Sequence, residues 1–95
     1  MGIKKAGRIT INVGESKGLG YTGVGMLFIN GQDSFNQTAQ IILPNSGALT
    51  VGFSSNNSVF GTTSDFIVQI EGGISTPVVV TNNWTNPITF SFVIF

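Results

Sequence analysis

The sequence predicts an all-β fold, a small β-sandwich of about eight short antiparallel strands. Ile and Val together number 20, against 7 for Ala and Leu, and β-branched residues favour strands over helices. Thirteen Gly and 28 Asn, Ser and Thr provide turn residues. Turn signals recur about every 8 to 12 residues, which is typical of sandwiches and barrels. We expect one domain over residues 1–95, jelly-roll-like, with an immunoglobulin-like sandwich as the alternative.

The last segment, residues 87–95, has the strongest strand pattern in the chain. It is β-branched and aromatic and carries no charge. Because side chains alternate along a strand, Phe90, Phe92 and Ile94 share one face. An apolar segment of this kind needs neighbours on both sides, so we expect it to be an inner strand of a sheet.

The first segments are expected to be an arm, a strand and a hinge. Residues 1–7 are interpreted as a flexible N-terminal arm. In the strand at residues 8–13, Ile9, Ile11 and Val13 are expected to face the core, before Gly14 ends it. Residues 18–25 are interpreted as a glycine-rich connection; their G-x-G-x-x-G match precedes a strand, whereas a dinucleotide site needs a helix there.

Six further strands complete the expected fold, with polar turns between them. In the third of these, Leu49, Val51 and Phe53 alternate and are expected to face the core. The turn before it, Pro44-Asn45-Ser46-Gly47, places Pro and Gly where a β-turn favours them. The six strands are expected at residues 26–30, 37–43, 48–53, 59–60, 65–71 and 76–81.

The residue types exclude several classes of function. There is no His and no Cys, and only four carboxylates are scattered along the chain, so we expect no enzyme, no metal site and no cofactor. The formal net charge is zero, so we expect neither a nucleic acid nor a membrane as partner.

A tryptophan in an amide-rich turn suggests carbohydrate binding as an alternative function. Trp84 lies between Asn83 and Thr85, and such a ring can stack on a sugar while neighbouring amides bind its hydroxyls. Tyr21 is expected to be a second stacking platform. The alternative hypothesis is therefore a carbohydrate-binding module or lectin that uses Tyr21, Asn83 and Trp84, with a glycan as partner.

The low charge favours self-assembly as the main hypothesis. Charged residues make up 8% of the chain, against about 25% in typical soluble domains. Soluble monomers protect strand edges with Lys, but no basic residue follows Lys17. We therefore expect a structural subunit whose copies join by β-strand pairing. The residues expected to carry this assembly are Ile9, Ile11 and Val13 of the first strand and Phe90, Phe92 and Ile94 of the last.

The chain resembles the small jelly-roll subunits of bacterial extracellular fibres, such as endospore appendages. The resemblance lies in the Thr/Asn/Gly-rich style, in the segment Leu43-Pro44-Asn45-Ser46-Gly47-Ala48-Leu49-Thr50-Val51 and in the apolar last strand. It implies a fibre, appendage or particle as the product of assembly. The family's connectors carry cysteines, which this chain lacks. We expect synthesis in the cytoplasm without a signal peptide, and a final location on an extracellular surface, an appendage or a virion.

Overall fold

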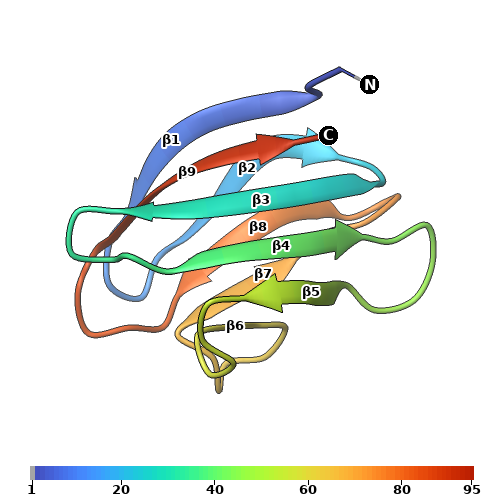
Figure 1. The fold of residues 1–95 in the computed structure, drawn as a ribbon. Coiled ribbons are helices and arrows are strands. Elements are labelled where there is room, and N and C mark those ends of the chain that lie inside the picture. The colour runs from blue at the N-terminus through green and yellow to red at the C-terminus, as the bar shows by residue number, and fades with distance from the viewer. Residues whose placement is uncertain (1) are drawn as a thin grey trace.

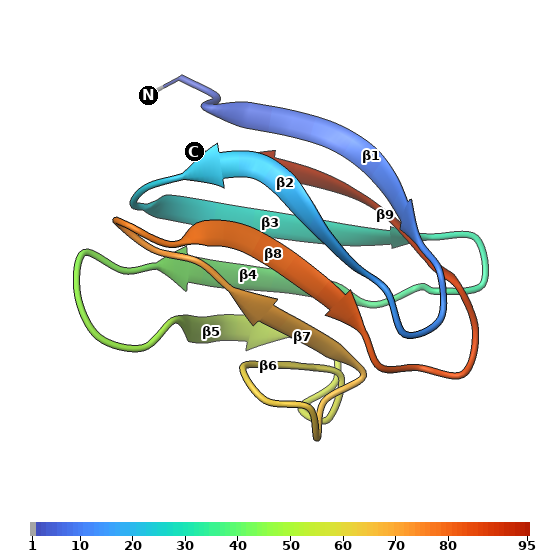
Figure 2. The same ribbon diagram turned by 180° about the vertical axis from the view of Figure 1, so that it is seen from behind.

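A computed structural model describes residues 2–95, which form nine strands in two sheets packed face to face (Figures 1 and 2). The all-β sandwich predicted from the sequence is confirmed, with one strand more than expected. Only the pairing of β6 with β7 is parallel among these strands. Sheet A contains, in spatial order, β1 (Lys5–Ile11), β9 (Ile88–Ile94), β3 (Gly25–Gln32), β4 (Thr38–Leu43) and β5 (Thr50–Ser54). Sheet B contains β2 (Ser16–Thr22), β8 (Pro77–Asn82), β7 (Val68–Glu71) and β6 (Phe60–Gly61).

The connections between the sheets are partly those of a jelly roll. The chain crosses from sheet A to sheet B after β1, returns before β3, crosses again after β5 and returns before β9 (Figure 1). The first strand pairs with the last, and β2 pairs with β8, which gives the nested arrangement of a jelly roll. The run β3–β4–β5 departs from that pattern, because all three strands stay in sheet A as an antiparallel meander.

Strand β9 lies inside sheet A, between β1 and β3, as its sequence predicted. Phe90 and Ile94 are fully buried, and Phe92 is 6% exposed. The rings of Phe90 and Phe92 meet with their centroids 6.4 Å apart. The alternate side chains, Thr89 and Val93 among them, point to the other face of the sheet and are half-buried. Because inward and outward side chains alternate without interruption, β9 contributes one continuous row of side chains to the core.

Strand β1 begins and ends earlier than predicted. It pairs with β9 from Lys5 onward, so residues 5–7 of the expected arm belong to a strand, while Met1 lies outside the described residues. Ile11 is fully buried and Ile9 is half-buried, as expected. Val13 is 53% exposed, and its predicted core position is wrong. The chain turns between Asn12 and Glu15 to reach sheet B, and this turn ends the alternation that Val13 was expected to follow.

The glycine-rich segment at residues 18–25 is not a hinge, because most of it is strand β2. Leu19 is 3% exposed and belongs to the core, and Tyr21 packs against the core from the same strand. The pairing of β2 with β8 shifts register between Gly18 and Thr22, where Gly20 has a positive φ of 77°. Glycine therefore serves here as a bulge residue within a strand.

A second irregularity reverses the expected orientation of Phe53. In the pairing of β4 with β5, Ile41 faces Val51 but Gln40 faces Phe53, so Gly52 is an extra residue in β5. One inserted residue moves the next side chain to the opposite face of the sheet. Phe53 is accordingly 57% exposed on the outer face of sheet A, and its predicted core position is wrong.

Asn82 is the one buried polar side chain among residues 2–95. Its Nδ2 donates to the carbonyl oxygens of Ile11 and Asn86, each at 2.9 Å. Its Oδ1 accepts a 2.8 Å hydrogen bond from the backbone N–H of Trp84. One carboxamide thus joins the end of β1 to both sides of the β8–β9 loop, and it sets the position of Trp84.

The two predicted core positions at the end of the first strand allow a matched test. We expect Ile11→Ala to lower the free energy of unfolding by about 3 kcal/mol, because it leaves a cavity in the core. Val13→Ala should change it by less than about 0.5 kcal/mol, because that side chain is exposed. Chemical denaturation monitored by circular dichroism measures both, and equal losses would contradict the end of β1 at Ile11.

We also expect Asn82→Ala to lower the free energy of unfolding by about 3 kcal/mol, because three backbone groups lose their partner in a buried position. Asn45→Ala, the same change in the exposed turn after β4, should lower it by less than about 0.5 kcal/mol. The same denaturation experiment compares the two. An Asn82→Ala protein as stable as the Asn45→Ala protein would show that the carboxamide does not hold the loop.

Candidate functional site

The outer face of sheet A carries an exposed apolar surface, which we call the apolar face. The strand register places its side chains in two adjacent rows, and neither row contains a charged residue. One row has a residue from each of the five strands. The other row has a residue from each of β3, β4 and β5, together with Phe95, which directly follows β9. The apolar members of the two rows are Ala6, Met26, Phe28, Ile42, Phe53, Val93 and Phe95.

The first row is fixed by the pairing of each strand with the next. Val93 faces Ala6 on one side and Phe28 on the other. Phe28 faces Gln40, which in turn faces Phe53. Phe28 is 38% exposed and Phe53 57%, so two aromatic rings protrude from this row with an amide between them.

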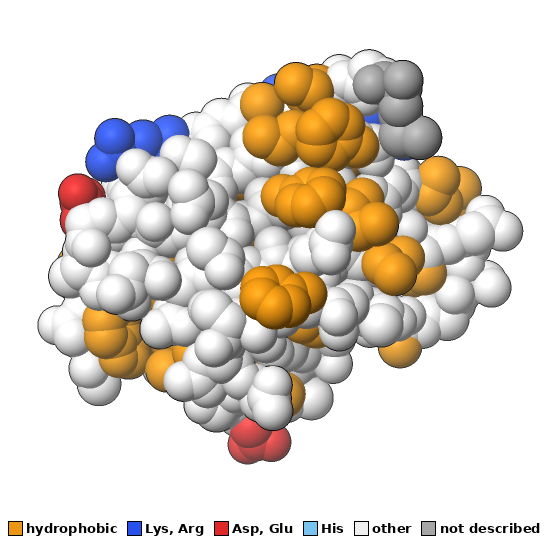
Figure 3. Space-filling view, viewed as in Figure 1, with side chains coloured by type: hydrophobic (Ala, Val, Ile, Leu, Met, Phe, Trp, Pro, Cys, Tyr) orange, Lys and Arg blue, Asp and Glu red, His pale blue; other side chains and the backbone are white. Residues whose placement is uncertain are grey.

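The second row lies beside the first, towards the start of β3. Met26 exchanges two backbone hydrogen bonds of 2.9 Å with Phe95, and it faces Ile42 across β4. Phe95 also packs edge-on against Phe28, with ring centroids 5.6 Å apart. Figure 3 shows the hydrophobic side chains gathered over the centre and right of this face, with the charged side chains towards its rim.

A shallow hollow of about 320 Å³ lies on this face between Phe28 and Phe53. Asn30, Thr38, Ala39 and Gln40 also line it. The face therefore has both protruding rings and a depression that is large enough to accept a side chain.

Three of the four basic residues lie along the opposite side of the sandwich from β5, on its two edge strands β1 and β2, and Lys4 directly precedes β1. Lys5 and Arg8 belong to β1, and Lys17 belongs to β2. Lys17 Nζ donates a 2.8 Å hydrogen bond to the backbone carbonyl of Thr10, on β1. Ammonium groups at a strand edge disfavour the addition of another strand, so this edge is protected, contrary to the expectation from the sequence.

The other edge of sheet A is uncharged. Strand β5, from Thr50 to Ser54, contains no charged residue, and its irregularity is the bulge at Gly52. The acceptor that the sequence assigned to an added strand, β9, is already paired on both sides within the chain. An intermolecular strand would therefore find its most accessible position beside β5.

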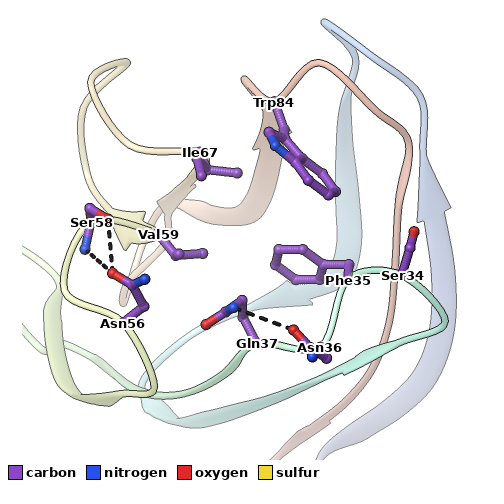
Figure 4. A pocket seen from close by; sticks show the side chains of 9 residues that line it. All are labelled: Ser34, Phe35, Asn36, Gln37, Asn56, Ser58, Val59, Ile67 and Trp84. Carbon is purple, nitrogen blue, oxygen red and sulfur yellow. Dashed lines mark hydrogen bonds between the residues drawn. The ribbon is translucent and has the colours of Figure 1, made fainter.

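A second candidate site is a pocket of about 240 Å³ at one end of the sandwich (Figure 4). Segments from four connections of the chain converge there: those between β3 and β4, β5 and β6, β6 and β7, and β8 and β9. Its lining is aromatic, aliphatic, amide and hydroxyl, without a charged side chain. The nine lining residues are Ser34, Phe35, Asn36, Gln37, Asn56, Ser58, Val59, Ile67 and Trp84.

Close packing of the β3–β4 connection brings Phe35 beneath Trp84. Gly31 donates its backbone N–H to the carbonyl of Gln37 at 2.8 Å, and a Cβ at this glycine would collide with the carbonyl oxygens of Phe35 and Gln37. Phe35 is 4% exposed, and its ring centroid lies 6.0 Å from that of Trp84. The absence of a side chain at Gly31 lets this segment fold back over β3.

Only one of the three residues predicted for sugar binding lines this pocket. Tyr21 lies near the other end of β8, where Thr22 faces Pro77, so roughly 20 Å of strand separates it from Trp84. Its hydroxyl donates to the carbonyl of Val24. Asn83 Nδ2 donates to the Phe66 carbonyl at 3.1 Å and to Gln69 Oε1 at 3.2 Å. The three residues therefore do not share this pocket.

Within residues 2–95, no group of three or more acidic, His or Cys side chains is placed to hold a metal ion. The same part of the chain contains no helix of the length and apolar character needed to cross a bilayer.

Comparisons of the chain with protein-family models, with curated proteins and with solved structures gave no match.

Proposed function

We propose that the protein is a non-enzymatic structural subunit that assembles with copies of itself, and that the apolar face is its main contact. The observation that carries this proposal is the uncharged row across all five strands of sheet A, from Ala6 to Phe53. An exposed apolar patch of a few hundred Å² on a soluble domain often marks an interaction surface. A sheet face of this kind is stable in water when another apolar surface covers it.

A second copy of the chain is the partner that fits this surface. The partner must be neutral and apolar where it meets the two rows, and the same face of another copy has this character. The chain has a formal net charge of zero, so two copies do not repel each other as whole molecules.

The dimensions of the two rows agree with a weak pair. Five strands at about 4.8 Å spacing and the four residues per strand that two rows span, at about 3.3 Å, give a planar area of roughly 300 Å². Two such faces bury about 600 Å², before the relief of the side chains is included, and interfaces below about 1,200 Å² are weak or transient.

Strand pairing, the mode of assembly expected from the sequence, belongs at β5 in this proposal. Lys5 and Lys17 protect the β1 and β2 edges, whereas β5 is uncharged and its outer edge has no partner strand in sheet A. Face-to-face pairs joined through β5 would form the fibre or particle. The resemblance to subunits of bacterial extracellular fibres remains a prediction on which this proposal does not depend.

The apolar face can be tested by placing charge on it. We expect the wild-type mass in sedimentation equilibrium to rise with concentration above that of a single chain. The double variant Phe28→Lys, Phe53→Lys should raise the dissociation constant at least about a hundredfold, because pairing would bury two ammonium groups per copy. Ile74→Lys is the matched control, since Ile74 is 51% exposed but lies outside sheet A.

Circular dichroism must first show that all three proteins are folded. A wild-type protein with single-chain mass at the highest concentration reached would refute the proposal. If the Ile74→Lys protein dissociated as readily as the double variant, the net charge of the chain, rather than the apolar face, would control association.

The role of β5 has a separate test. We expect Gly52→Lys to leave pairs intact but to abolish longer assemblies, because a lysine at this edge disfavours strand addition. Room exists for the side chain, since a Cβ at Gly52 would lie 3.5 Å from the Gln40 carbonyl. Negative-stain electron microscopy beside light scattering distinguishes fibres or particles from pairs. Wild-type protein that forms pairs and nothing larger would exclude the fibre and particle roles.

A further inference from the structure

The Trp84 pocket combines an apolar wall with oriented amides, and its interior is neutral. Figure 4 shows the rings of Trp84 and Phe35 next to each other on one wall, with Asn56 across from them and Gln37 below, between Phe35 and Asn56. The two ring planes are tilted by 54° to each other. Apolar C–H groups of a ligand would contact these rings, while its polar groups would meet the amides.

Hydrogen bonds within the protein fix the orientation of the side-chain amides of Asn56 and Gln37. Asn56 Oδ1 accepts from the backbone N–H of Ser58 at 3.0 Å and from the hydroxyl of Ser58 at 2.8 Å. Gln37 Oε1 accepts from the Ser55 hydroxyl at 2.7 Å. Because each carbonyl oxygen is engaged on one side, the NH₂ group points the other way, and Figure 4 draws the Asn56 nitrogen on the side of Val59.

Donors that are already oriented lose little conformational entropy on binding. Gln37 Nε2 has only a long hydrogen bond of 3.4 Å, to Asn36 Oδ1, which an incoming acceptor can replace. The pocket thus offers NH₂ donors to ligand oxygens, together with the hydroxyls of Ser34 and Ser58 on its rim.

The uncharged lining and the volume of the pocket limit the class of ligand that it can bind. None of the nine lining residues is charged, so an ionised phosphate or carboxylate would lose water without gaining a counter-charge. A purely apolar ligand would leave the amide donors without partners. The volume of about 240 Å³ lies below the roughly 300 Å³ at which pockets for drug-sized molecules begin. The ligand must be small, neutral and amphipathic.

We infer that this pocket binds a single neutral sugar ring, a pyranoside. Its C–H face lies against Trp84 and Phe35, and its hydroxyl oxygens accept hydrogen bonds from Gln37 and Asn56. Trp84 is the residue that the sequence suggested for this chemistry, but its partners come from the connections that follow β3 and β5.

The pocket and the apolar face share no residue, so sugar binding and self-assembly are independent. The lining residues of the pocket lie in connections at one end of the sandwich, whereas Phe28 and Phe53 stand within strands of sheet A. Copies paired through the apolar face would each retain an accessible pocket.

Intrinsic fluorescence tests the inference directly, because Trp84 is the only tryptophan of the chain. The full chain is titrated with the methyl pyranosides of glucose, galactose, mannose and N-acetylglucosamine, with glycerol as a polyol control. We expect a saturable change in Trp84 emission with at least one pyranoside and none with glycerol. Gln37→Ala should weaken the binding of that sugar about tenfold, because one oriented donor is lost.

Asn45→Ala removes an amide from the turn after β4, at the opposite end of the molecule, and should bind as the wild type does. The Phe28→Lys, Phe53→Lys protein should also bind the sugar normally, which separates this test from that of assembly. Folded protein that shows no saturable change with any of the four pyranosides would overturn the inference. Unweakened binding by Gln37→Ala would overturn the assignment of the site.

Discussion

The fold depends on the burial of β9 between β1 and β3. Its inward side chains, from Ile88 to Ile94, form a fully or almost fully buried row, and its two neighbours come from the beginning and the first third of the chain. Each buried aromatic or aliphatic side chain contributes about 1.5–3 kcal/mol when it leaves water. Lys5 pairs with Ile94, so sheet A is complete only when the two ends of the chain have come together.

The same strand supplies both faces of sheet A, which explains the exposed apolar surface. The outward side chains of β9 include Val93, which belongs to the row that runs from Ala6 to Phe53. No residue of this row is charged, whereas basic residues lie on β1 and β2, where they protect an edge. The distribution of charge therefore favours association through a face and through β5, and it disfavours association through the β1 edge.

Alternation in the sequence was sufficient to predict the class of fold and the strands that follow an uninterrupted pattern. It identified the inner position of β9 and the burial of Ile11. It failed for Val13, where a turn ends the strand, and for Phe53, where the extra residue Gly52 reverses the side chains. Both failures come from local interruptions of a strand, which composition and periodicity do not reveal. The protective position of Lys17 was missed because it depends on which strands form the edges.

The residues that line the pocket could be predicted from the sequence only in part. Trp84 was identified because an aromatic ring in an amide-rich turn is a local signal. Phe35, Gln37 and Asn56 had no such signal, because they lie far from Trp84 in sequence and meet it only when separate connections converge. Their polar turns were visible in the sequence, but the order of the strands decides which turns share one end of the sandwich.

The pairing of β1 with β9 also brings the two ends of the described chain to one corner of the domain, where Lys4 donates its N–H to the carbonyl of Ile94 at 2.7 Å (Figure 1). A polypeptide attached at either end would leave the domain from this corner, beside Phe95. The domain is therefore suited to insertion into a loop of a host protein, because entry and exit points lie together. A circular permutant that joins the ends by a short linker and opens at Asn45 would keep all nine strands intact.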